Sequence, residues 1–358
     1  MSENKERFNI DDYLQEENRK YTVSAEDFFA TSLAQYDNFD NKAWSKGEGY
    51  TCPNFPMFND KMEGLEAGLY LFAGESNTGK TCLLTNLLWD YCMNETNKLF
   101  GVYFSLDDSI EEVIPRIISM NKLIPISVSS KPYRYQKRID AGEENTSIYQ
   151  EWLQKRTEGL ELLRSVNNKF KIEDGTKITC AEQLLDYCQK LQDYIKGLDE
   201  EANIIIGIDS LSDLTFPSQN FRSGDDKSLN DYIAKQVKKW AVEILKVPIF
   251  GSVHLRKVDQ RRRPNIADVK ESGRYVYEAS AVFVVHNDVS RNGQCASIYY
   301  TEPDSSEMLP IIEIQWAKNK KSSFKGRTYC HFVPNFSKVI ECTQEETDRF
   351  NNLIYSSK

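Results

Sequence analysis

Short apolar runs recur along the chain from about residue 51 and alternate with longer amphipathic stretches. The runs cover residues 69–73, 98–106, 203–211, 247–253, 280–286 and 311–317. Each run is nearly continuous, which predicts strands that are covered on both faces, as in a parallel sheet. Helical stretches lie between most of the runs. The pattern therefore predicts an α/β fold in which a mostly parallel, twisted sheet is flanked by helices.

Two segments stand outside this alternation. Residues 1–50 are polar with scattered aromatic side chains, and we interpret them as an arm or linker before one large domain over residues 51–358. A capping-type start at Ser24 and Asp27 predicts a lone helix in the arm, packed on the main domain or on a neighbouring chain. Residues 121–146 are polar and irregular, and they predict a surface excursion.

Composition and charge exclude several classes of protein. The chain has 40 % hydrophobic residues but no apolar run of about 18, so we expect no membrane span. The polar N-terminus lacks a signal-peptide pattern, and the eight cysteines include no CxxC pair, which argues against a zinc ribbon. Several cysteines lie in apolar runs, as is typical of reduced core residues in a cytosolic protein. A net charge of −9 argues against a general nucleic-acid coat but leaves room for a local basic channel.

Residues 74–81 read GESNTGKT, the G-x-x-x-x-G-K-T pattern of a P-loop. An apolar run precedes the loop and apolar residues at helical spacing follow it, which is the context that a P-loop needs. In such a loop the backbone N–H groups cradle phosphate oxygens, the lysine reaches the outer phosphates, and the threonine binds Mg²⁺. We therefore expect ATP to be bound by Gly74, Ser76, Asn77, Thr78, Gly79, Lys80, Thr81 and Cys82. The alternative is a glycine-rich turn without a ligand.

A P-loop ATPase also needs an acidic residue at the end of another buried strand, to hold Mg²⁺. The run NIIIGIDS supplies Asp209 at its end. A second run, VYFSLDDS, ends in Asp107 and Asp108, one of which could orient the attacking water. The alternatives are structural: Asp209 as a helix cap or loop residue, and Asp107 or Asp108 as the cap of the helix that follows.

Five segments in register extend this pattern into a family resemblance. They are FPMFNDKMEGLEAGLYLFAGESNTGKT, GVYFSLDDSIEEVIPRII, IIIGIDSLSDL, VPIFGSVHLRK and RPNIADVKESGRYVYEASAVFVV. In order and spacing they resemble DnaB-type replicative helicases, whose RecA-like motor is shared by phage primase-helicases and the mitochondrial replicative helicase. The resemblance covers residues 51–341. It implies a RecA-like P-loop NTPase fold, a hexameric ring, ATP and Mg²⁺ between subunits, and single-stranded DNA in the central channel.

The resemblance assigns roles to catalytic residues one at a time. Lys80, Thr81 and Asp209 match the family pattern fully, with Thr81 and Asp209 as ligands of Mg²⁺. His254 stands where the family has a γ-phosphate-sensing glutamine or histidine, directly before the DNA loop. The alternative for His254 is an ordinary histidine near a strand end.

Basic residues gather in residues 254–274 of this acidic chain. The segment ADVKESG resembles the family's DNA-binding loop DLRESG, which places Lys270, Glu271 and Gly273 near the DNA backbone. The other basic residues are Arg256, Lys257, Arg261, Arg262, Arg263 and Arg274. Since no aromatic residues are interleaved for base stacking, we expect phosphate contacts rather than base readout. The alternative is a solvated loop. A second candidate DNA loop, residues 215–230, carries Phe216, Phe221 and Arg222.

Two positions depart from the family pattern. Asp107 stands where the family has a glutamate, and its side chain is one methylene shorter, which would slow hydrolysis. The family sends an arginine finger across the subunit interface from a K-x-R motif, and here Lys318 and Lys320 occupy those positions. A lysine cannot make the bidentate phosphate contact of an arginine. Either Lys320 is the finger, or Arg327 or Lys321 replaces it, or hydrolysis is weak, or this basic turn is simply solvated.

We interpret the sequence as an ATP-dependent DNA helicase of the DnaB type, with 5′–3′ polarity implied by the family. The stretch Ala25–Leu33 is expected to hook onto the next subunit. No bacterial-type helical N-terminal domain and no zinc-dependent primase is evident, which fits a phage or mobile-element helicase in the cytoplasm, working with a separate primase or loader. Two alternatives stay open: a ring ATPase that acts as a nucleotide switch on a protein partner, and a DNA-loading or recombination factor.

Overall fold

The computed structural model describes residues 35–41, 43, 44, 47, 49–219, 221, 226–257, 259, 262–270 and 273–356. The chain divides into two compact units, residues 1–49 and residues 50–358. In the first unit, residues 35–41 and 43–44 are helical, and Tyr36, Phe39 and Trp44 are exposed. Most of the predicted arm helix, including the predicted hook at Ala25–Leu33, lies outside the described residues.

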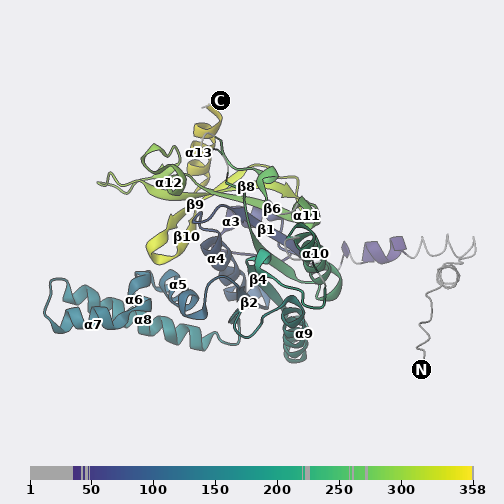
Figure 1. Cartoon of the computed structure of the whole chain (residues 1–358), viewed down its shortest axis with the longest axis horizontal. Coiled ribbons are helices and arrows are strands. Elements are labelled where there is room, and N and C mark those ends of the chain that lie inside the picture. Colours follow the sequence, from purple (N-terminus) through teal and green to yellow (C-terminus); the bar gives the residue numbers. More distant parts are fainter. Residues whose placement is uncertain are drawn as a thin grey trace, which may run out of the picture. The chain divides into compact units, whose positions relative to one another are not determined.

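The second unit is built on one sheet (Figure 1). In the described residues it has the strand order β10-β9-β8-β6-β1-β5-β4-β2-β3, with β7 beside β8. The strands are β1 (Gly68–Gly74), β2 (Leu99–Ser105), β3 (Phe170–Asp174), β4 (Asn203–Asp209), β5 (Pro248–His254), β6 (Ala281–Asn287), β7 (Tyr299–Tyr300), β8 (Leu309–Asn319), β9 (Arg327–Val333) and β10 (Lys338–Glu341). The strands from β6 to β3 in this order are parallel, and β7 to β10 add antiparallel pairs. The mostly parallel sheet predicted from the sequence is confirmed.

The six predicted strands correspond to β1, β2, β4, β5, β6 and β8, and every end agrees to within two residues. The expected parallel direction was wrong for β8, which runs antiparallel to β6. Its apolar run is continuous because both of its faces are covered: Ile312 and Trp316 belong to one apolar cluster and Ile311 to another. The pattern therefore reports burial and not strand direction.

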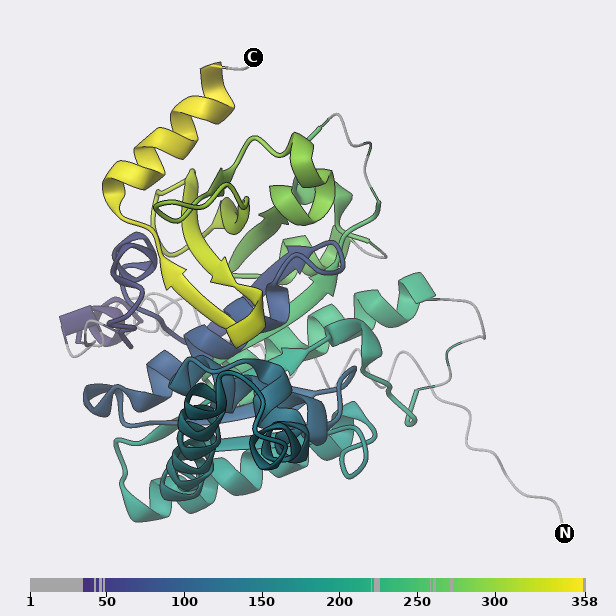
Figure 2. The same cartoon turned by 90° about the vertical axis from the view of Figure 1, so that its left-hand side faces the viewer.

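Helices cover both faces of the sheet, because successive side chains of a strand point to opposite faces. On one face, Tyr70 and Phe72 of β1 pack with α3 (Pro56–Met62), α4 (Lys80–Met93) and α5 (Ile110–Lys122). On the other face, Leu69 and Leu71 pack with α9 (Ala181–Leu198), α10 (Asp226–Lys239) and α11 (Gly273–Glu278). The last two helices are α12 (Asp288–Asn292) and α13 (Gln344–Ser356), and α13 lies against the antiparallel end of the sheet (Figure 2).

The excursion predicted at residues 121–146 is helical, so the expectation of an irregular segment was wrong. α6 (Ile126–Ser130), α7 (Pro132–Asp140) and α8 (Thr146–Ser165) form an extension beside α5 (Figure 1). It has a small apolar core of its own, made by Ile118, Ile124, Val128, Tyr135 and Tyr149. Polar residues outnumber these side chains, which hides the helical spacing of the apolar ones in the sequence.

Two predictions from composition can be compared with the structure. All eight cysteines are free, and five of them are buried, namely Cys52, Cys92, Cys188, Cys330 and Cys342. This confirms the expectation of reduced core cysteines. In the part of the chain that the structure describes, no helix combines the length and the apolar character needed to cross a bilayer.

Candidate active site

The P-loop joins the end of β1 to the start of α4. Its backbone requires glycine at two positions. Gly79 has a φ of 92°, a left-handed conformation that glycine adopts without strain. A Cβ atom on Gly74 would lie 2.7 Å from Thr78 Oγ1 and 2.9 Å from the carbonyl oxygen of Val285. A larger residue at either position would therefore distort the loop.

Lys80 is the first residue of α4, and its side chain turns back into the loop. Its ammonium group donates hydrogen bonds to the carbonyl oxygens of Gly74 (2.9 Å) and Glu75 (2.7 Å). Burial lowers the pKa of Lys80 to about 8, although the nearby carboxylates of Asp209, Glu75 and Asp107 oppose this effect. An anion in the loop would favour the charged form of the lysine.

Asp209 ends β4 at the same edge of the sheet, and three hydroxyl groups donate to its carboxylate. Thr81 Oγ1 donates to Oδ2 at 2.6 Å, and the Tyr103 hydroxyl donates to the same oxygen at 3.0 Å. Ser252 of β5 donates to Oδ1. The fold thus brings the two predicted Mg²⁺ ligands, Thr81 and Asp209, into contact, and Mg²⁺ prefers oxygen ligands of this kind. Sequence reasoning missed Tyr103 and Ser252, whose only signal was a polar atom within an apolar strand.

Asp107 and Asp108 follow β2 and have different surroundings. Asp107 is exposed and faces the same cavity as the P-loop. Asp108 forms an ion pair with Arg116 of α5 at 2.5 Å. The alternative that either aspartate caps α5 was wrong, because Ser109 is the N-cap residue and its N–H donates to Glu112 at 3.1 Å. Asp107 is therefore the better placed of the two to reach a ligand.

A cavity of about 430 Å³ lies over the P-loop. The predicted residues that line it are Ser76, Asn77, Thr78, Gly79, Lys80, Thr81, Cys82, Asp107, Asp209 and His254. The sequence did not point to four further lining residues, Arg116, Ser210, Phe332 and Pro334. Phe332 and Pro334 offer an apolar surface against which a flat ring can pack, whereas the P-loop side is polar and suits phosphates. The cavity thus has the two kinds of surface that a nucleotide needs.

His254 lies between this cavity and a second one of about 590 Å³. The second cavity is lined by Glu75, Ser76, His254, Leu255, Arg256, Lys257, Lys270 and Arg291. We call it the basic cavity. Gly74 pairs with His254 in the sheet, and the N–H of Lys270 donates to the carbonyl oxygen of His254 at 3.0 Å. The end of β5 therefore connects the P-loop directly to the loop that carries Lys270.

Arg291 of α12 is a member of the basic cavity that the sequence did not indicate. Its guanidinium lies 3.7 Å from the Glu75 carboxylate and donates to the carbonyl oxygen of Asp259 at 2.9 Å. It thereby bridges the P-loop and the basic loop. Its place could not be found from sequence spacing, because α12 follows β6 and meets the P-loop only in the folded sheet.

Several predicted DNA-contacting residues lie elsewhere. Arg263 forms ion pairs with the buried carboxylates of Glu313 and, at 3.5 Å, Asp288, so its guanidinium is directed into the protein. Phe216 is buried and packs against Trp240, which contradicts the expectation that it reaches DNA. Gly273 begins α11, and a Cβ atom there would meet nothing within 4 Å, so no close approach inside this chain explains the glycine. Glu271, Arg261 and Arg222 lie outside the described residues.

Lys318 and Lys320 lie far from the P-loop of their own chain. Because β8 is antiparallel to β6, Asn319 pairs with Ala281 at the edge where the parallel strands begin. Seven residues of β1 separate that edge from the P-loop, roughly 20 Å at the rise of a strand. Lys318 donates to the carbonyl oxygens of Val276 (2.5 Å) and Tyr277 (2.8 Å), and burial and the neighbouring Lys320 lower its pKa to about 8. Lys320 itself is exposed.

The two other candidates for a finger are engaged inside the chain. Lys321 pairs with Glu66 at 2.8 Å, and Arg327 pairs with the buried carboxylate of Glu313 at 2.7 Å. Lys320 is therefore the member of this group that is best placed to reach another molecule.

Comparisons with known proteins agree with this geometry. The family model described as "DnaB-like helicase C terminal domain" matches residues 52–340. A "Probable replicative DNA helicase" of Trieres chinensis is 25 % identical over 285 residues, which are 77 % of this chain and 53 % of that protein. The chain thus spans about half the length of this curated relative.

Two solved structures share the fold. One is an isolated ATPase domain, with a TM-score of 0.63 and 19 % identity, covering 88 % of this chain and 98 % of that one. The other is a DnaB-like replicative helicase, described together with its interactions with primase, with a TM-score of 0.62 and 18 % identity over 92 % of this chain and 70 % of that one. The RecA-like fold expected from the resemblance is confirmed. Because the family model matches most of its length, the chain belongs to the DnaB-like helicase C terminal domain family.

Proposed function

We propose that the chain is the motor of a replicative DNA helicase, which hydrolyses ATP, translocates on single-stranded DNA and unwinds duplex. The observation that carries the proposal is the position of His254, which lines both the nucleotide-shaped cavity and the basic cavity. A group in that place can respond to a phosphate on one side and act on a bound polyanion on the other. Family membership supports the same assignment.

The residues of the first cavity fit ATP and Mg²⁺. The P-loop amides and Lys80 would hold the phosphates, and Thr81 with Asp209 would hold the metal ion. The metal ion neutralises charge on the phosphates when it is bound. Asp107 would orient the attacking water by accepting its proton in a hydrogen bond. Arg116, held by Asp108, would add positive charge to the wall of the cavity.

Coupling to DNA would follow the hydrogen bond between His254 and Lys270. Loss of the γ-phosphate removes a partner from the His254 ring and shifts the end of β5. The Lys270 N–H is bonded to the His254 carbonyl oxygen, so the shift reaches the basic loop directly. Arg256, Lys257 and Lys270 would contact the phosphates of single-stranded DNA without reading its bases.

We further propose that the chain acts in a ring, a hexamer as in its family, with 5′–3′ polarity. The exposed Lys320, remote from its own P-loop, would reach the nucleotide of the neighbouring subunit. A separate primase or loader would be its partner in replication, since one helicase of similar structure is described with its interactions with primase.

The central experiment measures ATP hydrolysis with and without single-stranded DNA, alongside strand displacement on a forked duplex. We expect DNA to stimulate hydrolysis and the fork to be unwound. Lys80→Ala should abolish both activities and leave the circular dichroism spectrum unchanged, because Lys80 contacts loop carbonyls and not the apolar core. Hydrolysis without strand displacement would instead support a nucleotide switch. Filaments rather than rings in electron micrographs would support a loading or recombination factor.

The two neighbouring aspartates provide a matched pair. Asp107→Asn should bind ATP normally and hydrolyse it about 10²–10⁴-fold more slowly, the range of general-base contributions. Asp108→Asn should lose much less, because its amide oxygen can still accept a hydrogen bond from Arg116. Single-turnover hydrolysis and nucleotide affinity measure the two effects separately. Equal losses in both variants would remove Asp107 from its assigned role.

The basic cavity predicts how DNA affinity changes with salt. Lys257→Ala and Lys270→Ala should each weaken binding uniformly across sequences and reduce the slope of log affinity against log salt by about one unit. Lys190→Ala removes the same charge from an exposed position on α9, outside the basic cavity, and serves as the control. Fluorescence anisotropy over a salt series measures the slope. Identical slopes in all three variants would place DNA elsewhere.

Mixed assemblies test Lys320. A Lys320→Ala subunit keeps its P-loop, and a Lys80→Ala neighbour can still offer it Lys320. Mixing these two variants, each inactive alone, should therefore restore part of the ATPase rate. The control replaces Lys80→Ala by the double variant Lys80→Ala/Lys320→Ala, which offers no lysine and should restore nothing. Equal rates in both mixtures, once mass spectrometry verifies mixed assembly, would exclude a role for Lys320 in trans.

A further inference from the structure

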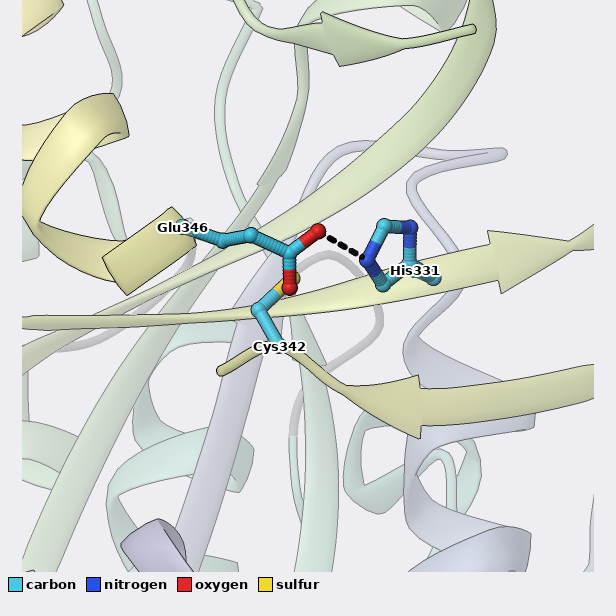
Figure 3. Close-up of side chains that lie close together, drawn as sticks. All are labelled: His331, Cys342 and Glu346. Atoms are coloured by element: carbon cyan, nitrogen blue, oxygen red, sulfur yellow. Dashed lines mark hydrogen bonds and ion pairs between the residues drawn. The ribbon is translucent and has the colours of Figure 1, made fainter. Parts of the chain in front are cut away.

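Three side chains with metal-binding atoms meet where the sheet ends against α13. His331 lies on β9, Cys342 directly follows β10, and Glu346 lies in the first turn of α13 (Figure 3). One ligand atom from each of the three lies within 4.8 Å of the other two. His331 Nε2 and the Glu346 carboxylate are 2.9 Å apart. Cys342 is buried, whereas the other two are partly exposed, so an ion could enter from solvent.

This group is separate from the proposed nucleotide site. Phe332 lines the nucleotide cavity, and its neighbour His331 points to the opposite face of β9, because side chains alternate along a strand. The apolar cluster on the side of Cys342 contains Tyr329, Phe350 and other residues of the antiparallel end. The function proposed above does not use any of the three potential ligands.

Their chemistry favours zinc. Zn²⁺ takes thiolate sulfur, imidazole nitrogen and carboxylate oxygen, and three protein ligands with water as the fourth form a complete tetrahedral site. In such a site the ligand atoms lie roughly 3.3–3.6 Å apart, given metal–ligand bonds of about 2.0–2.3 Å. The observed separations, from 2.9 Å to at most 4.8 Å, bracket that spacing. Shifts of about 1 Å, within the reach of side-chain rotation, would complete the geometry.

The surrounding contacts hold the ligands in place. Glu346 Oε2 accepts hydrogen bonds from the Thr343 N–H (2.9 Å) and hydroxyl (3.1 Å), which directs Oε1 toward His331. The ring of Tyr300 lies edge-on to the His331 imidazole, with the centroids 4.3 Å apart. Outer partners of this kind orient metal ligands and strengthen metal binding.

We propose that His331, Cys342 and Glu346 bind a zinc ion that fastens α13 to the end of the sheet. Binding displaces the thiol proton of Cys342 to solvent and replaces the His331–Glu346 contact by two bonds to the metal. A competing explanation is an ion pair between His331 and Glu346 beside a buried, inert thiol. The two explanations differ over Cys342, because an ion pair does not use the sulfur.

Cobalt(II), which reports sulfur ligation by its colour, distinguishes them. The full-length chain, freed of metal and reduced, is titrated with Co²⁺ in excess Mg²⁺, which occupies sites made of oxygen ligands. We expect a sulfur-to-cobalt charge-transfer band and tetrahedral visible bands that saturate at one equivalent and vanish on adding Zn²⁺. Cys342→Ser and His331→Gln should lose the bands. Cys295→Ser, which removes an exposed thiol outside the group, should keep them.

Thermal unfolding of the same proteins provides a second measurement. Zn²⁺ should raise the unfolding midpoint of the wild type and Cys295→Ser, but not that of Cys342→Ser, provided that all three are folded by circular dichroism. If Cys342→Ser does not fold, Glu346→Gln replaces it, because its amide keeps the contact with Thr343. Absence of a charge-transfer band in the wild type, or an equal band in Cys342→Ser, would overturn the proposal.

Discussion

The carboxylate of Asp209 is the point on which the arrangement of the active site depends. It ends β4, and its hydrogen bonds come from Thr81 after β1, Tyr103 on β2 and Ser252 on β5. These strands are neighbours in the sheet, and because they are parallel, their carboxyl ends meet at one edge. A buried carboxylate without such donors would be costly, whereas hydrogen bonds to a charged group contribute about 1.5–3 kcal/mol each. The charge that suits Mg²⁺ thus also aligns the strand ends that surround it.

The same edge explains why two cavities of different character lie side by side. β5 ends between them, and its last residue, His254, lines both. On the P-loop side, acidic and hydroxyl groups surround a lysine; on the other side, Arg256, Lys257 and Lys270 gather in a chain whose net charge is −9. The separation is short enough for one backbone hydrogen bond to join the two.

Sequence reasoning succeeded where the signal is local. The P-loop is a contiguous pattern with a known strand and helix around it, and the six apolar runs mark strands because burial on both faces leaves no polar position. It failed where pairing decides. The direction of β8 depends on its neighbour, and β3 and β9 carry too many partly exposed positions to read as buried runs. The helices at 126–165 are polar for the most part, since only one side of each is covered.

The same limit applies to single residues of the site. Arg263 has a basic residue's sequence context, but its partners Glu313 and Asp288 lie on other elements, and only the fold shows that its charge is already used. Tyr103, Ser252 and Arg291 gave no motif, because their importance comes from contacts across the sheet. In contrast, the neighbouring Asp107 and Asp108 could be named from the sequence as a pair, and the ion pair with Arg116 separates their roles.

The antiparallel course of β8 has a consequence for how such a motor is controlled. It places Lys320 at one edge of the sheet and the P-loop at the other, so under the proposed function no single chain holds a whole catalytic centre. Each chain supplies two halves of two different centres. Mass action then governs turnover: dilution silences the enzyme, and local accumulation of chains activates it. A cell could thereby keep free subunits from consuming ATP simply by keeping them apart.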